Sequence, residues 1–187
     1  MPQIIWLNWC LTELDLATIP AAIVRGFSRR AVDKVLPPNS PRPGLGSDMG
    51  SNMGRTLMAG SWNAEIYEPL VQHVWPEDVQ CAKNRMSGMW SSEQPLFRHL
   101  VASGRKTLLF AGVNTDQCVL GTLSDAYSNG WDCILVDDCC GTGTPGGREV
   151  CLLNGSVSLR SVFDGVREAF VNDETWLFCS GAFRVCG

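Results

Sequence analysis

TLLFAGVNTDQCVLGTLSDAYSNGWDCILVDDCCGT, residues 107–142, is the stretch that predicts the fold. Thr107–Val113 is a continuous apolar run of strand length, as is typical of a parallel strand buried on both faces. Cys133–Val136 is expected to form the next strand, after a helix from about Gln117 to Ser128 that ends at Asn129 and Gly130. The apolar face of that helix should carry Val119, Leu120, Leu123, Ala126 and Tyr127. A strand, a helix and a second parallel strand indicate an α/β fold with a mainly parallel open sheet.

Cys118 follows the loop Asn114–Gln117 at the carboxyl end of the first of these strands. Open α/β sheets bind ligands at that edge. A cysteine at the start of a helix lies near unpaired backbone N–H groups and the positive end of the helix dipole, and both favour the nucleophilic thiolate. Position alone leaves two interpretations open, a nucleophile or a small buried core residue.

Length and composition indicate one globular domain over residues 1–187. With 45% hydrophobic and 18% charged residues, the chain has enough apolar material for a core. Residues 37–60 are rich in Pro, Gly, Ser, Asn and Met, which predicts a long irregular loop, and residues 172–187 are expected to form an atypical apolar tail. The formal net charge of −4, with scattered Lys and Arg, gives no electrostatic reason to expect a nucleic-acid or acidic-lipid partner.

The nine cysteines indicate reduced thiols and not a disulfide framework, because their number is odd and their spacing irregular. No C-x-x-C pair occurs, and His73 and His99 are not spaced to share one helix face, so no metal site is predicted. No apolar run reaches membrane-spanning length, and the amino terminus lacks a basic start and a cleavage site. A cytoplasmic location without membrane attachment is the expectation.

Two further helices are expected. Thr12 can cap a helical segment at Glu13–Ile19. Pro95–Ser103 should form a second helix, whose apolar stripe consists of Leu96, Phe97, Leu100 and Val101. His99 lies outside that stripe or at its border, and we interpret it as structural or solvated.

Two motifs carry a resemblance to a known family. GVNTDQCV at 112–119, followed by DDCCGT at 137–142, resembles the nucleophile region of the isochorismatase-like cysteine hydrolases, which include nicotinamidases and ureide amidohydrolases. KNRMSGMW at 83–90 resembles the lysine segment of the same family. Two motifs in the right order are more specific than either alone, and the matches cover most of the chain from residue 4 to about 170.

The resemblance implies a three-layer α/β/α fold with a catalytic triad at its sheet edge. Cys118 would be the nucleophile, and Lys83 would stabilise its thiolate and orient an acid. The backbone N–H groups of Asn114 and Cys118 would form the oxyanion hole, with a cis peptide bond between Val113 and Asn114. A lone lysine could instead be a solvated surface charge.

Three further residues of the lysine segment are candidates for the wall of the substrate pocket. They are Arg85, Met89 and Trp90. Each could instead be an ordinary packing residue, and for Met89 and Trp90 the two interpretations have equal weight. In this family the loop corresponding to 37–60 borders the pocket or a subunit contact, so a homo-oligomer is expected.

Family members usually begin with an apolar strand that ends in the general-base aspartate, followed by a helix and then by the strand matched here to Ile4–Asn8. The first strand, its helix and the aspartate are therefore expected to be absent, which makes this an N-terminally truncated version. The candidates for a replacement acid are Glu13, Asp15 and Asp48. Asp116 and Asp137 are closer to the nucleophile but are also explained as loop and cap residues.

The implied activity is hydrolysis of a C–N bond in a small amide or ureide through a thioester-like intermediate, without a cofactor. Nicotinamidases hold a metal in an Asp and His cluster that has no counterpart in this sequence, which weakens that specific activity. Isochorismatases proper lack the nucleophilic cysteine, so Cys118 argues against them. The alternative is a truncated, catalytically weak or silent hydrolase-like protein that binds a small ligand or a partner.

Overall fold

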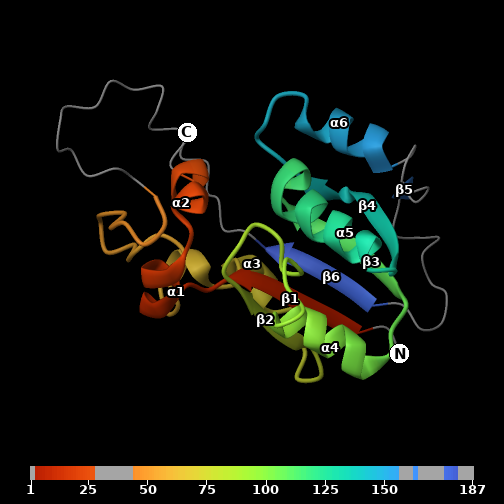
Figure 1. Ribbon diagram of the computed structural model, residues 1–187, viewed down its shortest axis with the longest axis horizontal. Helices are drawn as coiled ribbons and strands as arrows, with labels where there is room; N and C mark the ends of the chain where they lie inside the picture. Colours follow the sequence, from red (N-terminus) through yellow and green to blue (C-terminus); the bar gives the residue numbers. More distant parts are fainter. Residues whose placement is uncertain (1–2, 28–43, 156–161, 164–174, 181–187) are drawn as a thin grey trace. The chain divides into compact units, whose positions relative to one another are not determined.

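The computed structural model describes residues 3–27, 44–155, 162–163 and 175–180. The chain divides into two compact units (Figure 1). The larger comprises Met1–Asn8 and Ile66–Gly181, and the smaller comprises Trp9–Glu65 and Ala182–Gly187. In the described part of the chain, every helix is too short or too polar to cross a membrane.

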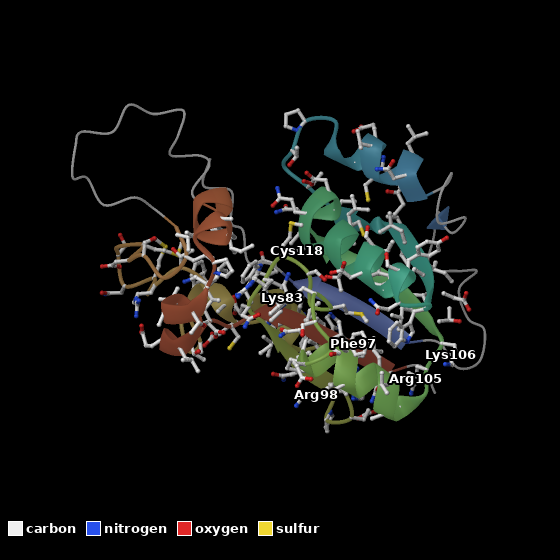
Figure 2. All side chains as sticks on the ribbon, in the orientation of Figure 1. Lys83, Phe97, Arg98, Arg105, Lys106 and Cys118 are labelled. Atoms are coloured by element: carbon white, nitrogen blue, oxygen red, sulfur yellow. The ribbon has the colours of Figure 1, made fainter. Side chains whose placement is uncertain are left out.

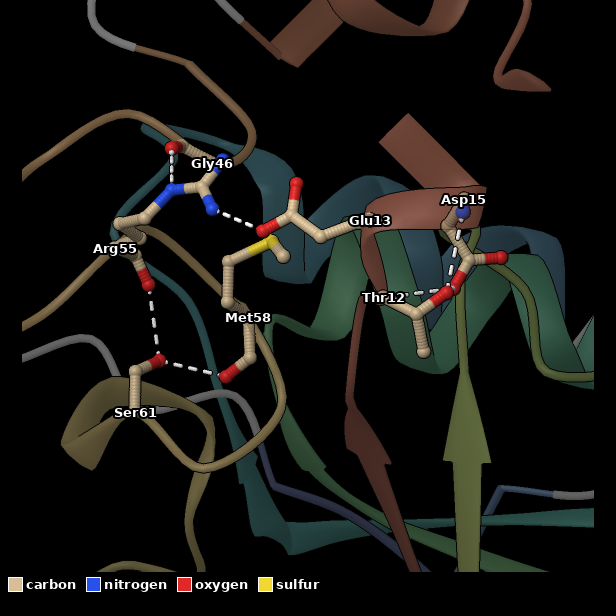
Figure 3. A network of polar contacts seen from close by, with 7 residues as sticks. All are labelled: Thr12, Glu13, Asp15, Gly46, Arg55, Met58 and Ser61. Carbon is tan, nitrogen blue, oxygen red and sulfur yellow. Dashed lines mark hydrogen bonds and ion pairs between the residues drawn. The ribbon is translucent and has the colours of Figure 1, made fainter. Parts of the chain in front are cut away.

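The larger unit is built on a six-stranded sheet. Its strands are β1 (Gln3–Trp9), β2 (Val79–Lys83), β3 (Thr107–Val113), β4 (Asp132–Gly141), β5 (Val162–Phe163) and β6 (Thr175–Ser180). Their order is β2-β1-β6-β3-β4-β5, and all four pairs from β1 to β5 are parallel. The arrowheads of β1 and β2 also point the same way in Figure 3. The predicted parallel α/β fold is confirmed.

The strand β6 comes from the carboxyl-terminal part of the chain and lies between β1 and β3. Cys179 is in register with Leu7 of β1 on one side and with Gly112 of β3 on the other. Ser180 is paired with Asn8 at the carboxyl edge of the sheet. Part of the segment expected to be an atypical tail is thus a central strand, and the rest of that segment lies outside the described residues.

Helices α4 (Pro95–Ser103) and α5 (Leu120–Ser128) pack against one face of the sheet. The described part of this unit also contains α6 (Gly147–Asn154) and the short α3 (Glu68–Val71). Leu96, Leu100 and Leu123 are fully buried or nearly so, in one core with Leu108 and Phe110 of β3. Leu109 and Val136 form a separate small cluster, as expected for residues that point to the opposite side of β3 and β4.

Two details of the predicted helices are wrong. The helix expected from about residue 117 starts earlier, because a π-helical turn, Thr115–Val119, precedes α5. Tyr127 and Val101 were expected on apolar faces, yet they are 48% and 60% exposed. Each follows a residue that is fully buried, Ala126 or Leu100, and one residue turns the helix by about 100°, which carries the next side chain away from the core.

The smaller unit contains α1 (Glu13–Thr18), α2 (Ala21–Phe27) and the 3-10 helix η2 (Trp62–Ala64). Thr12 caps α1 as predicted, in a reciprocal capping box with Asp15 (Figure 3). The described part of the expected irregular loop is held by Arg55, which pairs with Glu13 and donates to the carbonyl of Gly46 at 2.7 Å. Residues 37–43 lie outside the described residues.

Candidate active site

The turn that carries Cys118 follows directly from β3. The peptide bond between Val113 and Asn114 is cis, as expected from the family resemblance. The carbonyl of Asn114 accepts hydrogen bonds from the backbone N–H groups of Gln117, at 3.0 Å, and Val119, at 3.2 Å, which closes the π-helical turn. Cys118 is half-buried on this turn, and Figure 2 shows it at the same end of the sheet as Lys83.

Lys83 is the last residue of β2 and is only 2% exposed. A solvated surface lysine, the alternative left open by the sequence, does not fit this burial, because a lysine is almost never fully buried without partners. Its Nζ donates to the carbonyl oxygen of Met86 at 2.6 Å. The ammonium group is therefore held beneath its own loop, at the sheet edge where ligands bind in α/β folds.

The pocket-wall candidates of the lysine segment differ in their surroundings. Met89 is 2% exposed and belongs to the hydrophobic core, which agrees with a packing role. Trp90 is 45% exposed, and the guanidinium carbon of Arg85 lies 4.9 Å from the centroid of its ring. Asn84 joins the two side chains, because it accepts from Arg85 through its carbonyl and from Trp90 through its side chain. Arg85 and Trp90 thus form a preorganised cationic and aromatic surface.

Thr122 is a site residue that the sequence reasoning missed. It is fully buried, and its hydroxyl donates to the carbonyl of Cys118 at 2.8 Å. The same hydroxyl accepts from the backbone N–H of Gly88 at 3.2 Å. A threonine four residues after the cysteine was a usable signal for the first bond, since Ser and Thr in helices often donate to the i−4 carbonyl. Nothing in the sequence indicates the hydrogen bond from Gly88.

Three of the candidate acids lie in the smaller unit and already have bonding partners there. Glu13 pairs with Arg55, Asp15 completes the capping box, and Asp48 accepts from the backbone N–H of Gly50 at 2.9 Å. These are the contacts of structural carboxylates in turns and caps.

The other two candidate acids lie near the cysteine turn in the larger unit. Asp116 accepts a hydrogen bond from the hydroxyl of Thr142. Asp137 is 8% exposed and forms an ion pair with Arg148, while its Oδ1 has no hydrogen-bond partner within the described part of the structure. Both carboxylates therefore have structural roles of the kind left open by the sequence.

Four other cysteines, of which three are buried and Cys139 is half-buried, have raised pKa values. Burial raises the pKa of Cys81 to about 11, that of Cys133 to about 12 and that of Cys151 to about 11. Burial also raises the pKa of Cys139, with Asp138 adding to the effect. These four groups are protonated thiols at neutral pH and are poor nucleophiles.

His99, which could be read as structural or solvated, has a structural contact. Its Nε2 lies 3.0 Å from the side-chain oxygen of Gln3, and burial together with the charge of Arg105 lowers its pKa. Within residues 3–27, 44–155 and the two short described strands, no cluster of three or more His, Cys, Asp or Glu side chains could hold a metal ion.

The amino-acid sequence matches a known protein family and several named relatives. The Isochorismatase domain family matches residues 16–156, which is more than half of the chain. Ureidoacrylate amidohydrolase RutB of Methylorubrum extorquens is 34% identical over 101 residues, covering 54% of this chain and 39% of that protein. The protein of the same name from Caulobacter segnis is 36% identical over 74 residues, covering 40% of this chain and 29% of the relative. The chain thus matches less than half the length of these relatives.

Solved structures share the fold at lower identity. An isochorismatase family protein from Desulfovibrio vulgaris aligns with a TM-score of 0.55 at 20% identity, over 87% of this chain and 94% of that one. The nicotinamidase/pyrazinamidase PncA from Bacillus subtilis aligns with a TM-score of 0.55 at 18% identity, over 88% of this chain and 100% of that one. At this identity the likeness establishes a shared fold.

Proposed function

Because this chain belongs to the isochorismatase family, we propose that it hydrolyses a C–N bond in a small amide or ureide, with Cys118 as the nucleophile. One observation carries the proposal: the half-buried Cys118, on the turn after β3, lies at the same end of the sheet as the buried ammonium of Lys83 (Figure 2). A positive charge near a thiol favours the thiolate, which is the attacking species.

The proposed reaction has two steps. The sulfur of Cys118 forms a bond to the carbonyl carbon, and the oxyanion accepts hydrogen bonds from the backbone N–H groups of Asn114 and Cys118. The C–N bond then breaks, the nitrogen leaves with the proton that the thiol gave up, and a thioester remains. Water hydrolyses the thioester to the acid product and restores the thiol. No organic cofactor enters this scheme.

The relatives named as ureidoacrylate amidohydrolases suggest a substrate that carries a carboxylate. Arg85 is the residue we assign to it, since its guanidinium is already oriented by the ring of Trp90 and matches a carboxylate in a planar, bidentate pair. Arg85→Lys keeps the charge but loses the planar pair. It should raise KM for an acidic ureide by about tenfold, the equivalent of about 1.4 kcal/mol, and leave KM for a neutral amide unchanged.

The second candidate is a weak or silent hydrolase-like protein that binds a small ligand through Cys118. The observation that favours it is that each of the five candidate acids already has a hydrogen-bond or ion-pair partner within the protein. A thiolate without a positioned acid would acylate but would protonate the leaving nitrogen slowly, at a cost of about 10²–10⁴-fold in rate.

Two assays separate the two candidates. The first measures ammonia release from ureidoacrylate, nicotinamide and a simple amide, and the second measures the burst of acylation when the protein reacts with an activated ester. Steady release that Cys118→Ala abolishes supports the hydrolase. One equivalent of acyl group bound at Cys118 without further turnover supports the silent protein. Hydrolysis that survives Cys118→Ala contradicts both. A homo-oligomer and a cytoplasmic location stay predictions, which size-exclusion chromatography and cell fractionation can test.

A further inference from the structure

We propose that Thr122 is a positioning residue, whose buried hydroxyl fixes the lysine loop against the turn that carries Cys118. This inference rests on the proposed function, since it concerns the alignment of the same two side chains. It follows from two hydrogen bonds of the Thr122 hydroxyl, one to Cys118 in the preceding turn and one to Gly88, which lies 34 residues earlier in the sequence.

The first step is the connection between Lys83 and its loop. Lys83 Nζ donates to the carbonyl of Met86, so the position of the ammonium depends on the position of residues 86–88. The side chain of Met86 reaches the start of α5, where its Cε lies 3.2 Å from the place that a Cβ on Gly121 would occupy. The loop therefore lies in contact with the start of α5.

The second step is the clamp on Gly88. On one side, a Cβ at this residue would lie 2.7 Å from Cδ2 of Leu7 in β1, so the loop backbone is pressed against the sheet. On another side, its N–H donates to Thr122. Gly88 is buried, and a buried N–H left without an acceptor costs roughly 1–3 kcal/mol, so the loop loses this position if the hydroxyl is removed.

The third step leads to the nucleophile. The same hydroxyl donates to the carbonyl of Cys118, so both of its hydrogen-bonding functions are used within the protein. Lys83 is thus connected to Cys118 by three hydrogen bonds and by the backbone of residues 86–88, and the Thr122 hydroxyl takes part in two of those bonds. A misplacement of about 1 Å in a catalytic pair can cost about 10²-fold in rate, so the hydroxyl should affect chemistry more than substrate binding.

Thr122→Val tests this proposal, because valine has nearly the same shape and lacks the hydroxyl. We expect the rate constant for alkylation of Cys118 by iodoacetamide, read by peptide mapping at pH 7, to fall at least about tenfold, within the 10²-fold range for misplaced groups. With an active substrate, kcat should fall by a similar factor while KM stays the same. Exchange of the Gly88 amide hydrogen should become faster.

Thr122→Ser keeps the hydroxyl and should restore all three measurements close to the wild-type values. The matched control is Ser128→Ala, which removes a bond of the same type, to the carbonyl of Ser124 at 2.7 Å, from the exposed far end of the same helix. This variant should leave the alkylation rate of Cys118 unchanged. Where the valine variant does not fold, Thr122→Ala removes both bonds without added bulk and serves the same comparison.

A folded valine or alanine variant whose Cys118 reacts at the wild-type rate would overturn the proposal. The proposal would also be overturned if the alkylation rate of Cys118 fell equally in Thr122→Val and Thr122→Ser, because serine keeps the hydroxyl to which we assign the effect. Alkylation and amide exchange need no substrate, so they report on Thr122 even where Cys118→Ala retains hydrolysis and the proposed function itself fails.

Discussion

The hydroxyl of Thr142, just after β4, donates a hydrogen bond to Asp116, two residues before Cys118. Gly147 at the start of α6 approaches the same carboxylate so closely that a Cβ there would lie 2.8 Å from Asp116 Cγ. Asp116 is thus held between the end of the sheet and the next helix. The contact ties the cysteine turn to its neighbours, which agrees with a structural role for this acid.

Gly147→Ala should destabilise the protein for this reason. Asp116 cannot move away from the added methyl group without losing the bond from Thr142, so we expect a loss of roughly 1–3 kcal/mol, as is usual for overpacking. Urea denaturation measures it. Gly143→Ala is the control, because no atom lies within 4 Å of a Cβ at that position. Equal stability of the two variants would contradict the proposed clamp.

Removal of Arg148 should leave an unpaired carboxylate on Asp137. Asp137 is 8% exposed and Oδ1 already lacks a partner in the described part of the structure, while Arg148 is about half-exposed. Arg148→Gln should therefore cost roughly 1–3 kcal/mol of folding free energy. Adding Asp137→Asn should recover part of that loss, because the buried charge is then absent. A double variant less stable than the sum of the two single changes argues against the pair.

The free energy of unfolding should fall at alkaline pH. The pKa values of Cys81, Cys133 and Cys151 in the folded protein are about 11, 12 and 11, against 9.0 for an unperturbed thiol. The unfolded chain loses these protons first as the pH rises past 9, so ionisation favours unfolding. The stability that these groups contribute is fully present below pH 9 and is lost as the pH rises towards 11 to 12.

Cys133→Ala tests that pH dependence against the wild-type protein. Each buried thiol that ionises only on unfolding lowers stability by about 1.4 kcal/mol per pH unit above 9. The variant should be less stable at pH 7 because it leaves a small cavity, yet lose less stability between pH 9 and about pH 10. If the free energy of unfolding fell equally with pH in both proteins, Cys133 would not contribute to the loss of stability at alkaline pH.

Leu177→Pro should prevent stable folding of the larger unit. β6 pairs with β1 on one side and β3 on the other, and proline cannot donate a ladder hydrogen bond in a central strand. Val162→Pro is the comparison, because Val162 begins the edge strand β5, where proline is tolerated. Circular dichroism and size-exclusion chromatography measure folding and aggregation. A well-folded Leu177→Pro protein would contradict the central position of β6.

Local sequence was enough for several elements of this fold. The apolar run Thr107–Val113 and the helix Pro95–Ser103 have the predicted bounds, and Thr12 caps its helix as expected. These features depend on strand-like or helical periodicity and on a side chain that bonds to its own neighbours, so a short window contains the necessary information. The two motifs likewise identified the family, and with it the cis peptide bond at Asn114.

The tertiary structure decided what no short window contains. Residues 175–180 became a central strand because β1 and β3 offered unpaired edges on both sides, more than sixty residues away in sequence. Lys83 is buried, and Thr122 joins two motifs, because the packing of α5 against the lysine loop brings separate segments into hydrogen-bond distance. Such contacts depend on the packing of the whole chain, since each element only gains its partners when the others are in place.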